Sequence, residues 1–574
     1  MSIDSTHPKT LALAVLLSAL ILSGCRHGAG AADPTPSGRV TLQLLAINDF
    51  HGQLEPPQGH GADVVIGHEP DGRPRLAVTG GLEHLAGLIE HLRAQHPHTL
   101  LVSAGDLVGA SPLSSALFHD EPTIEAMNRL GLAMNAVGNH EFDDGVEELL
   151  RLKQGGCGPA HSCALGPFAG ASFPFLAGNV FKADGSPLFP ASLVREVDGV
   201  KVGFIGVTLE GTPAIVERKR VAGLTFVAEV EAVNAEVARL RARGVEALVL
   251  LVHQGAEHEG AIDGCDHVEG PVLGLAKAVD PSIDAVISGH SHAAYNCLID
   301  GRSVTSALSG GRVVTRLMLE LDRRSGDVVS LEAKNLPVLR DRTHPEMRAL
   351  VEAYVQKVAP LEHEVIGRLS HPLVAPRHGT SAAGESTLGN VVADAFLAAT
   401  EAEGAQLAFV NPGGLRADLP AGDVTYGDAF AASPFGNSLV MMNLTGAQIL
   451  EALEQQWQPK KQRILGASAG LRYVWREGAP GAHVVPGSVT LHGVPLEPSR
   501  TYRVTVNSFL STGGDGFSAF TRGSELGGGP QDLDALVQYL RSNSPLPRAQ
   551  LGRIRRDEAP RTARGVPPPD THRH

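Results

Sequence analysis

The chain has few aromatic residues, few cysteines and no long basic run. Aromatic residues are 4% of its 574 residues, whereas glycine occurs 66 times and proline 38 times. This composition favours a loop-rich α/β globular protein over a fibrous or disordered one, and the length implies more than one domain. A formal net charge of −14 argues against a nucleic acid polymer as partner.

The single long apolar run is LALAVLLSALIL, which follows Lys9. It is too short to span a bilayer and suits the core of a signal peptide over residues 1–25. It ends at Leu-Ser-Gly-Cys25, which resembles the lipidation site of bacterial lipoproteins. An ordinary signal peptide is the alternative. We expect export and lipid anchoring of Cys25 to the cell envelope, facing the periplasm or the cell surface, with residues 26–39 as a flexible tether.

Four cysteines remain after Cys25, and an even number in an exported protein favours disulfides. Three pairings are possible. We favour Cys157–Cys163, which closes a short Gly/Pro loop, and Cys265–Cys297, which brackets the His290 strand. Four buried free thiols are the alternative.

Strand-like and helix-like segments alternate over residues 40–340, which predicts a layered α/β domain. Residues 341–365 predict a linker helix. A second compositional block over 366–556 is long enough for its own core and predicts a second α/β domain. The Arg- and Pro-rich tail, 557–574, is expected to be disordered.

Five short polar motifs each follow an apolar, strand-like run. Strands that deliver side chains to the loops at their carboxyl ends are how open α/β sheets build sites. Carboxylate, amide and imidazole groups suit Zn, Mn or Fe and need no thiolate. We therefore predict a centre of two divalent metal ions, Zn, Mn or similar, from the ligands Asp49, His51, Asp106, Asn139, His253, His290 and His292.

These motifs resemble those of calcineurin-like metallophosphoesterases. The second block adds the motifs ESTLGN, NPGGLR, SPFGN and NSFLSTGGDGF, and the whole resembles the bacterial 5′-nucleotidase and UDP-sugar hydrolase family. The resemblance implies a metallophosphoesterase sandwich joined by a helix to a nucleotide-binding domain. It also implies that Asp106 bridges the two metals. One metal would have Asp49, His51 and His292 as further ligands, and the other Asn139, His253 and His290.

The resemblance further implies that His140 is catalytic, not a ligand, and that Asp143 orients it. A carboxylate next to an imidazole is a common arrangement for acid–base catalysis. A packing role for His140 at a helix start is the alternative.

Substrate binding is assigned to the second block. The resemblance implies that Phe435 and Phe509 sandwich the nucleobase, and aromatic faces can stack on any base. A role as ordinary core residues is the alternative. Asp515 would bind ribose hydroxyls. The remaining substrate-binding residues implied by the family are Asn411, Gly413, Gly414 and Arg416. One departure is Gly384, where some relatives have an arginine; Arg377 is the nearest substitute.

The sequence thus predicts a secreted hydrolase that removes phosphate from nucleoside 5′-monophosphates. It would touch the membrane only through its lipid. The alternatives are a hydrolase of UDP-sugars, nucleoside di- or triphosphates or 2′,3′-cyclic nucleotides, a sulfur-oxidation thiohydrolase of the same superfamily, and an inactive surface binding lipoprotein.

Overall fold

The computed structural model describes residues 38–216, 218–459 and 461–557. The expected signal peptide, the lipidation of Cys25, nearly all of the tether and the tail after Asp557 lie outside these residues. Within the described part of the chain, no helix is both long and apolar enough to cross a membrane.

Two six-stranded sheets form the N-terminal domain. The first has the order β16-β15-β1-β4-β5-β6 and the second β13-β14-β12-β11-β9-β8. In each sheet four neighbouring strands are parallel and the flanking strands are antiparallel. The strands of the first sheet are β1 (Arg39–Ile47), β4 (Thr99–Ser103), β5 (Leu132–Ala136), β6 (Phe175–Leu176), β15 (Val313–Asp322) and β16 (Val328–Pro337). Those of the second are β8 (Ser192–Val197), β9 (Val200–Val207), β11 (Ala247–Val252), β12 (Ala285–Ser288), β13 (Ala294–Ile299) and β14 (Arg302–Ala307).

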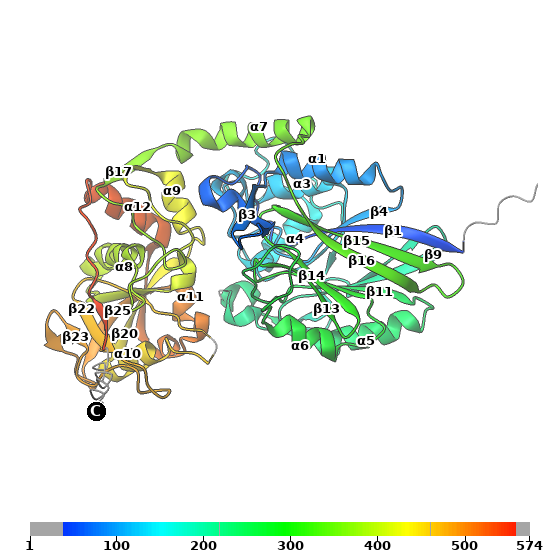
Figure 1. Ribbon diagram of the computed structural model, residues 1–574. Coiled ribbons are helices and arrows are strands. Elements are labelled where there is room, and N and C mark those ends of the chain that lie inside the picture. Colours follow the sequence, from blue (N-terminus) through cyan, green and yellow to red (C-terminus); the bar gives the residue numbers. More distant parts are fainter. Residues whose placement is uncertain (1–37, 217, 460, 558–574) are drawn as a thin grey trace, which may run out of the picture. The chain divides into compact units, whose positions relative to one another are not determined.

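Helices cover the outer face of each sheet (Figure 1). Successive side chains of a strand point to opposite faces, so Leu44 of β1 joins the apolar core between the sheets, whereas Leu45 packs toward the helices. Helices α1 (Leu82–Arg93), α3 (Glu121–Leu130) and α4 (Val146–Gln154) share that outer core with the first sheet. Helices α5 (Glu229–Arg241) and α6 (Pro271–Ala278) cover the second sheet. The predicted layered α/β sandwich is confirmed.

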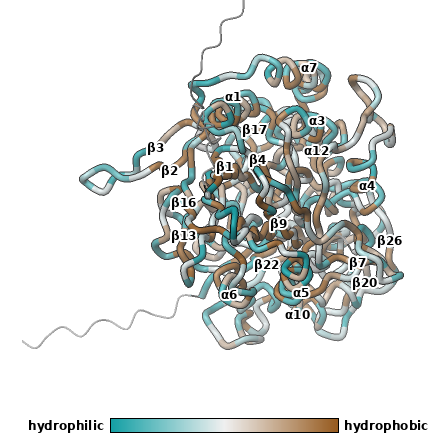
Figure 2. Tube along the Cα trace, turned by 90° about the vertical axis from the view of Figure 1, so that its right-hand side faces the viewer, coloured by the Kyte–Doolittle hydropathy of each residue, from teal (hydrophilic) through white to brown (hydrophobic). Residues whose placement is uncertain are grey.

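A hairpin of β2 (Asp63–His68) and β3 (Pro74–Val78) was not predicted. It extends away from the rest of the trace and has a hydrophilic turn (Figure 2). The turn is fixed locally, because Asp71 accepts hydrogen bonds from the backbone N–H and from Nε of Arg73.

Helix α7 (Pro345–Glu362) leads into the C-terminal domain. Its main sheet has the order β21-β18-β25-β20-β26, and a smaller sheet has the order β24-β23-β22-β27. The main strands are β18 (Leu407–Val410), β20 (Ser438–Thr445), β21 (Gly466–Ala467), β25 (Thr501–Asn507) and β26 (Ser524–Gln531). The small sheet contains β22 (Leu471–Trp475), β23 (Thr490–Leu491), β24 (Val494–Pro495) and β27 (Ile554–Arg556). The helices are α8 (Thr387–Thr400), α9 (Tyr426–Ala432), α10 (Gly446–Glu454), α11 (Ser508–Ser511) and α12 (Asp532–Ser542). The two-domain α/β fold is therefore confirmed.

Both predicted disulfides are present. Cys157 and Cys163 close a loop after α4, and Cys265 joins a loop to Cys297 of β13. The short loop is also fixed by Glu121 of α3, which accepts the backbone N–H of Cys163 at 2.6 Å. The alternative of four free thiols is excluded.

Candidate active site

The strand ends of both sheets deliver the predicted metal ligands to one place. Asp49 follows β1, Asp106 follows β4 and Asn139 follows β5, all in the first sheet. In the second sheet, His253 follows β11 and His290 follows β12. Because the central strands of each sheet are parallel, their carboxyl ends lie at a common edge.

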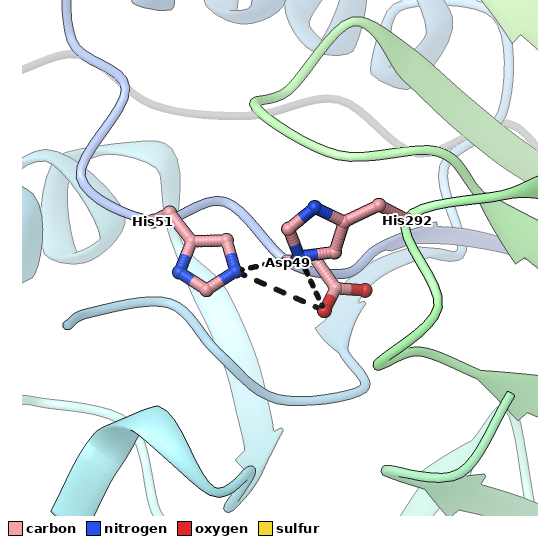
Figure 3. Close-up of side chains that lie close together, drawn as sticks. All are labelled: Asp49, His51 and His292. Atoms are coloured by element: carbon pink, nitrogen blue, oxygen red, sulfur yellow. Dashed lines mark hydrogen bonds and ion pairs between the residues drawn. The ribbon is translucent and has the colours of Figure 1, made fainter. Parts of the chain in front are cut away.

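The first cluster consists of Asp49, His51 and His292, and Figure 3 shows both imidazoles directed at the carboxylate. Nε2 of His51 and of His292 lie 4.0 Å and 3.5 Å from Oδ1 of Asp49. The two Nε2 atoms are 2.9 Å apart. Nitrogen and oxygen atoms converging in this way suit a divalent cation.

The second cluster consists of Asp106, His253 and His290. Oδ2 of Asp106 lies 3.0 Å from Nε2 of His253 and 3.7 Å from Nε2 of His51. Asp106 therefore faces both clusters, as a bridging carboxylate must. The amide oxygen of Asn139 is buried and has no hydrogen-bond partner among the described residues, which is costly unless a ligand satisfies it.

The hydrogen bonds of two imidazoles and the burial of two also fit metal binding. Nδ1 of His51 donates to the carbonyl oxygen of Gly109, and Nδ1 of His253 donates to that of Ala104, both at 2.8 Å. Each bond fixes the tautomer that leaves Nε2 free as a ligand. Burial lowers the pKa of His51 to about 3 and that of His290 to about 4, which favours the neutral, metal-binding form. His253 differs, because the effect of burial is outweighed by the carboxylate of Asp106, which raises its pKa to about 10, so this imidazole would lose a proton on binding a metal.

The ligand loops are conformationally unusual. Asp49, His51, Asp106, His290 and His292 all have a positive φ, between 48° and 75°. This left-handed region is uncommon for residues other than glycine and costs about 1–3 kcal/mol at each position. Five such residues in one centre show that the surrounding fold holds these loops in an unfavourable conformation, which is often found at functional sites.

His140 and Asp143 form the predicted pair. Nδ1 of His140 donates to Oδ2 of Asp143 at 2.6 Å, and the backbone N–H of His140 donates to Oδ1 of Asp106. Burial alone lowers the pKa of His140, but the carboxylates of Asp143 and Asp106 outweigh it and the net pKa is raised.

The sequence did not indicate a role for Glu141. Its carboxylate is 3% exposed and accepts the backbone N–H groups of Asp106, Leu107 and Gly138 and the side-chain amide of Asn135, at 2.7–3.0 Å. Glu141 therefore connects the loops after β4 and β5. The signal was its position directly after Asn139 and His140, inside the motif that supplied both.

A cleft of about 1380 Å³ contains the metal-ligand candidates Asp106, Asn139, His290 and His292. It is also lined by His140 and Asp143, and by every residue predicted to bind substrate: Asn411, Gly413, Gly414, Arg416, Phe435, Phe509 and Asp515. Neither phenylalanine is fully buried. The reading of Phe435 and Phe509 as ordinary core residues is thus not favoured by their placement.

Phe435 has two polar neighbours in the cleft. Its ring stacks on that of His140 with centroids 5.9 Å apart, and the guanidinium of Arg416 lies 5.8 Å from its centroid. Burial, and then the guanidinium of Arg377, lower the pKa of Arg416 to about 10. Two neighbouring guanidinium groups at this position suit an anionic substrate.

The glycine at position 384 has a structural reason. Its φ is +84°, and a Cβ there would lie 2.6 Å from Ile464. An arginine there would have a strained backbone and would force the Ile464 side chain to move, whereas Arg377 lines the same cleft as Arg416.

Comparison with known families matches both domains. Residues 42–294 match the calcineurin-like phosphoesterase family, and residues 365–522 match the 5′-nucleotidase C-terminal domain. The endonuclease YhcR of Bacillus subtilis strain 168 is 31% identical over 533 residues. That alignment covers 91% of this chain but only 42% of the relative.

Solved structures share the fold, among them two from Thermus thermophilus. The 5′-nucleotidase precursor of Thermus thermophilus is 28% identical, with a TM-score of 0.71, over 91% of this chain and all of the other. A sulfate thiohydrolase of the same species has a TM-score of 0.65 and 21% identity, over 90% of this chain and 96% of its own. At that identity the second likeness shows the fold alone.

Proposed function

Because the chain belongs to the 5′-nucleotidase family of metallophosphoesterases, a family of hydrolases that act on nucleotides, we propose that it removes phosphate from nucleoside 5′-monophosphates. The observation that carries this proposal is one cleft lined both by metal-ligand candidates and by the phenyl rings of Phe435 and Phe509.

The calcineurin-like fold implies divalent metals, and the two clusters are candidate sites for them. We propose Asp49, His51, Asp106 and His292 for one ion and Asp106, Asn139, His253 and His290 for the other. Bound Zn, Mn or a similar ion would supply an activated water and neutralise charge on the phosphoryl group.

His140 would act on the leaving oxygen of the substrate. Asp143 accepts a hydrogen bond from Nδ1–H, so the imidazole is held with Nε2 available to the cleft. Held in this way by Asp143, the imidazole can stabilise negative charge on the phosphate and give a proton to the departing ribose oxygen.

The C-terminal residues would bind the rest of the nucleotide. Phe435 and Phe509 would hold the base by stacking. Arg416, with Arg377 beside it, would attract the phosphate, and Asp515 and Asn411 would bind the sugar. The glycines at 413 and 414 leave room for close approach of the substrate to the backbone.

The size of the cleft favours a second candidate substrate class. At about 1380 Å³ it exceeds the 300–1,000 Å³ of a typical small-molecule pocket. UDP-sugars and nucleoside di- or triphosphates are therefore candidates beside the monophosphates.

For its location, we propose that the protein is exported and held at the cell envelope by a lipid on Cys25. The sequence around Cys25 supports this. The Cys25→Ser variant should lose the lipid mass and leave the membrane fraction, whereas a wild type recovered without lipid would exclude an anchor.

The function is tested with the purified protein loaded with Zn or Mn. Metal analysis should find two ions per chain, and AMP should be hydrolysed faster than an aryl phosphate. Hydrolysis of the aryl phosphate alone would exclude a nucleotidase. Turnover of a thiosulfonate but no phosphate ester would indicate the thiohydrolase, and no turnover at all would favour a binding lipoprotein.

A further inference from the structure

Arg463 lies in the segment between α10 and β21 and lines the active-site cleft. Its Nη1 donates to Oδ1 of Asp515 at 2.5 Å, and the two side chains are only 24% and 7% exposed. Nε of Arg463 is buried and has no hydrogen-bond partner among the described residues. A guanidinium carries five N–H donors, so this pair offers donors as well as an acceptor.

The position of Asp515 is fixed from several sides. Nδ2 of Asn411 lies 3.3 Å from its Oδ2, and Nε2 of Gln458 donates to its carbonyl oxygen. Asn411 in turn accepts a hydrogen bond from Asn507. Asp515 also has a φ of 56°, which a residue with a side chain seldom adopts. Such a conformation persists only where neighbours enforce it, and it is often associated with function.

The pair adjoins the expected base platform. A Cβ on Gly514 would lie 2.6 Å from the ring of Phe509, so this ring packs directly over the residue before Asp515. A nucleoside whose base stacks on Phe509 would therefore have its sugar next to Asp515 and Arg463.

We propose that Arg463 is a specificity-determining residue that, with Asp515, selects ribonucleotides over deoxyribonucleotides. This inference rests on the proposed function. A hydroxyl group both donates and accepts, so ribose hydroxyls donate to the Asp515 carboxylate while one of their oxygens accepts from the Arg463 guanidinium. A sugar without one hydroxyl leaves a largely buried donor or acceptor unpaired, which is the strongest basis for rejecting it.

The test compares kcat/KM for AMP, 2′-deoxy-AMP, 3′-deoxy-AMP and an aryl phosphate. In the wild type, AMP should be preferred over at least one deoxy substrate by about 10-fold or more, within the range for a lost buried hydrogen bond. Arg463→Met should reduce this ratio to about 1–2, mainly by raising KM for AMP, and should lower kcat/KM for AMP more than that for the aryl phosphate. Arg463→Lys should restore part of the preference.

Arg472→Met is the matched control, because Arg472 is exposed and donates to the carbonyl oxygen of Gly552 outside the cleft. It should behave as the wild type. An equal loss on AMP, deoxy-AMP and aryl phosphate in Arg463→Met would make Arg463 merely structural and overturn the proposal. A wild type with equal kcat/KM on all three nucleotides would also overturn it.

Inhibition by nucleosides separates this inference from the proposed function. Adenosine should inhibit aryl phosphate hydrolysis better than 2′- or 3′-deoxyadenosine, and Arg463→Met should remove the difference. If AMP is not hydrolysed but adenosine still inhibits selectively, the proposed function fails and sugar selection stands. If AMP is hydrolysed without any sugar preference, only the selection fails.

Discussion

The carboxylate of Glu141 accepts the backbone N–H of Asp106 at 3.0 Å. Asp106 is the residue that faces both metal-ligand clusters, so Glu141 holds the centre of the site without being a ligand candidate itself. Four donors converge on its two oxygens.

Glu141→Gln should therefore weaken metal binding. The amide keeps the size of the side chain, but its NH₂ group faces N–H donors that it cannot accept. We expect a loss of metal affinity of about 10- to 100-fold, as for other groups that support metal ligands. Metal retention during dialysis against a graded chelator series measures this. Retention equal to that of the wild type would show that the loops are fixed without Glu141.

His140→Ala should lower kcat by about 10²- to 10⁴-fold, the usual contribution of a positioned acid–base group. Metal content should stay near that of the wild type, because His140 belongs to neither ligand cluster. Steady-state kinetics and metal analysis on the same preparation measure kcat and the metal content. A fall in metal content as large as that in Asp106→Ala would make His140 a ligand.

Phe509→Ala should reduce kcat/KM for AMP by about 5- to 150-fold, because stacking is worth about 1–3 kcal/mol per base. Hydrolysis of an aryl phosphate should hardly change. The melting temperature must be measured in parallel, since the ring packs over Gly514. A lowered melting temperature, with equal losses of kcat/KM for both substrates, would show that Phe509 only packs in the fold and does not bind the base.

Asp532 lies outside the metal-ligand clusters, and we expect its ionisation to make the stability of the protein depend on pH. Burial raises its pKa to about 7, although Asn437 and the backbone N–H of Leu533 donate to its carboxylate. The folded protein therefore binds a proton between about pH 4 and 7 that the unfolded chain has released, so stability falls as pH rises through this range.

Asp532→Asn removes that titration. The melting temperature of the wild type minus that of the variant should be lower at pH 8 than at pH 5, while other titrating groups cancel in the difference. A difference that is independent of pH would contradict the raised pKa.

The sequence predicted the fold class and the place of the metal-ligand candidates because each candidate directly follows an apolar strand, and the topology of parallel strands brings such positions together. The structure gathers Asp49, His51 and His292, and Asp106, His253 and His290, as the motifs indicated. Their roles as metal ligands stay predictions.

The sequence could not predict hydrogen bonds between side chains of loops that lie far apart in the chain. Arg463 lies 52 residues before Asp515, in a polar segment with no periodic pattern. The β2–β3 hairpin was missed because its strand β3, Pro74–Val78, is mostly exposed and lacks the apolar alternation of a half-buried strand.

Each of the two metal-ligand clusters takes residues from both sheets of the N-terminal domain. An ion bound to either cluster would therefore cross-link the two layers, whose shared core is built from apolar side chains. By mass action, an ion at 100 times its dissociation constant stabilises the folded form by about 2.7 kcal/mol. Thermal melting of the sandwich thus becomes a gauge of cation occupancy, and a melting series over Zn, Mn, Mg and Ca would rank the ions by affinity without any knowledge of the substrate.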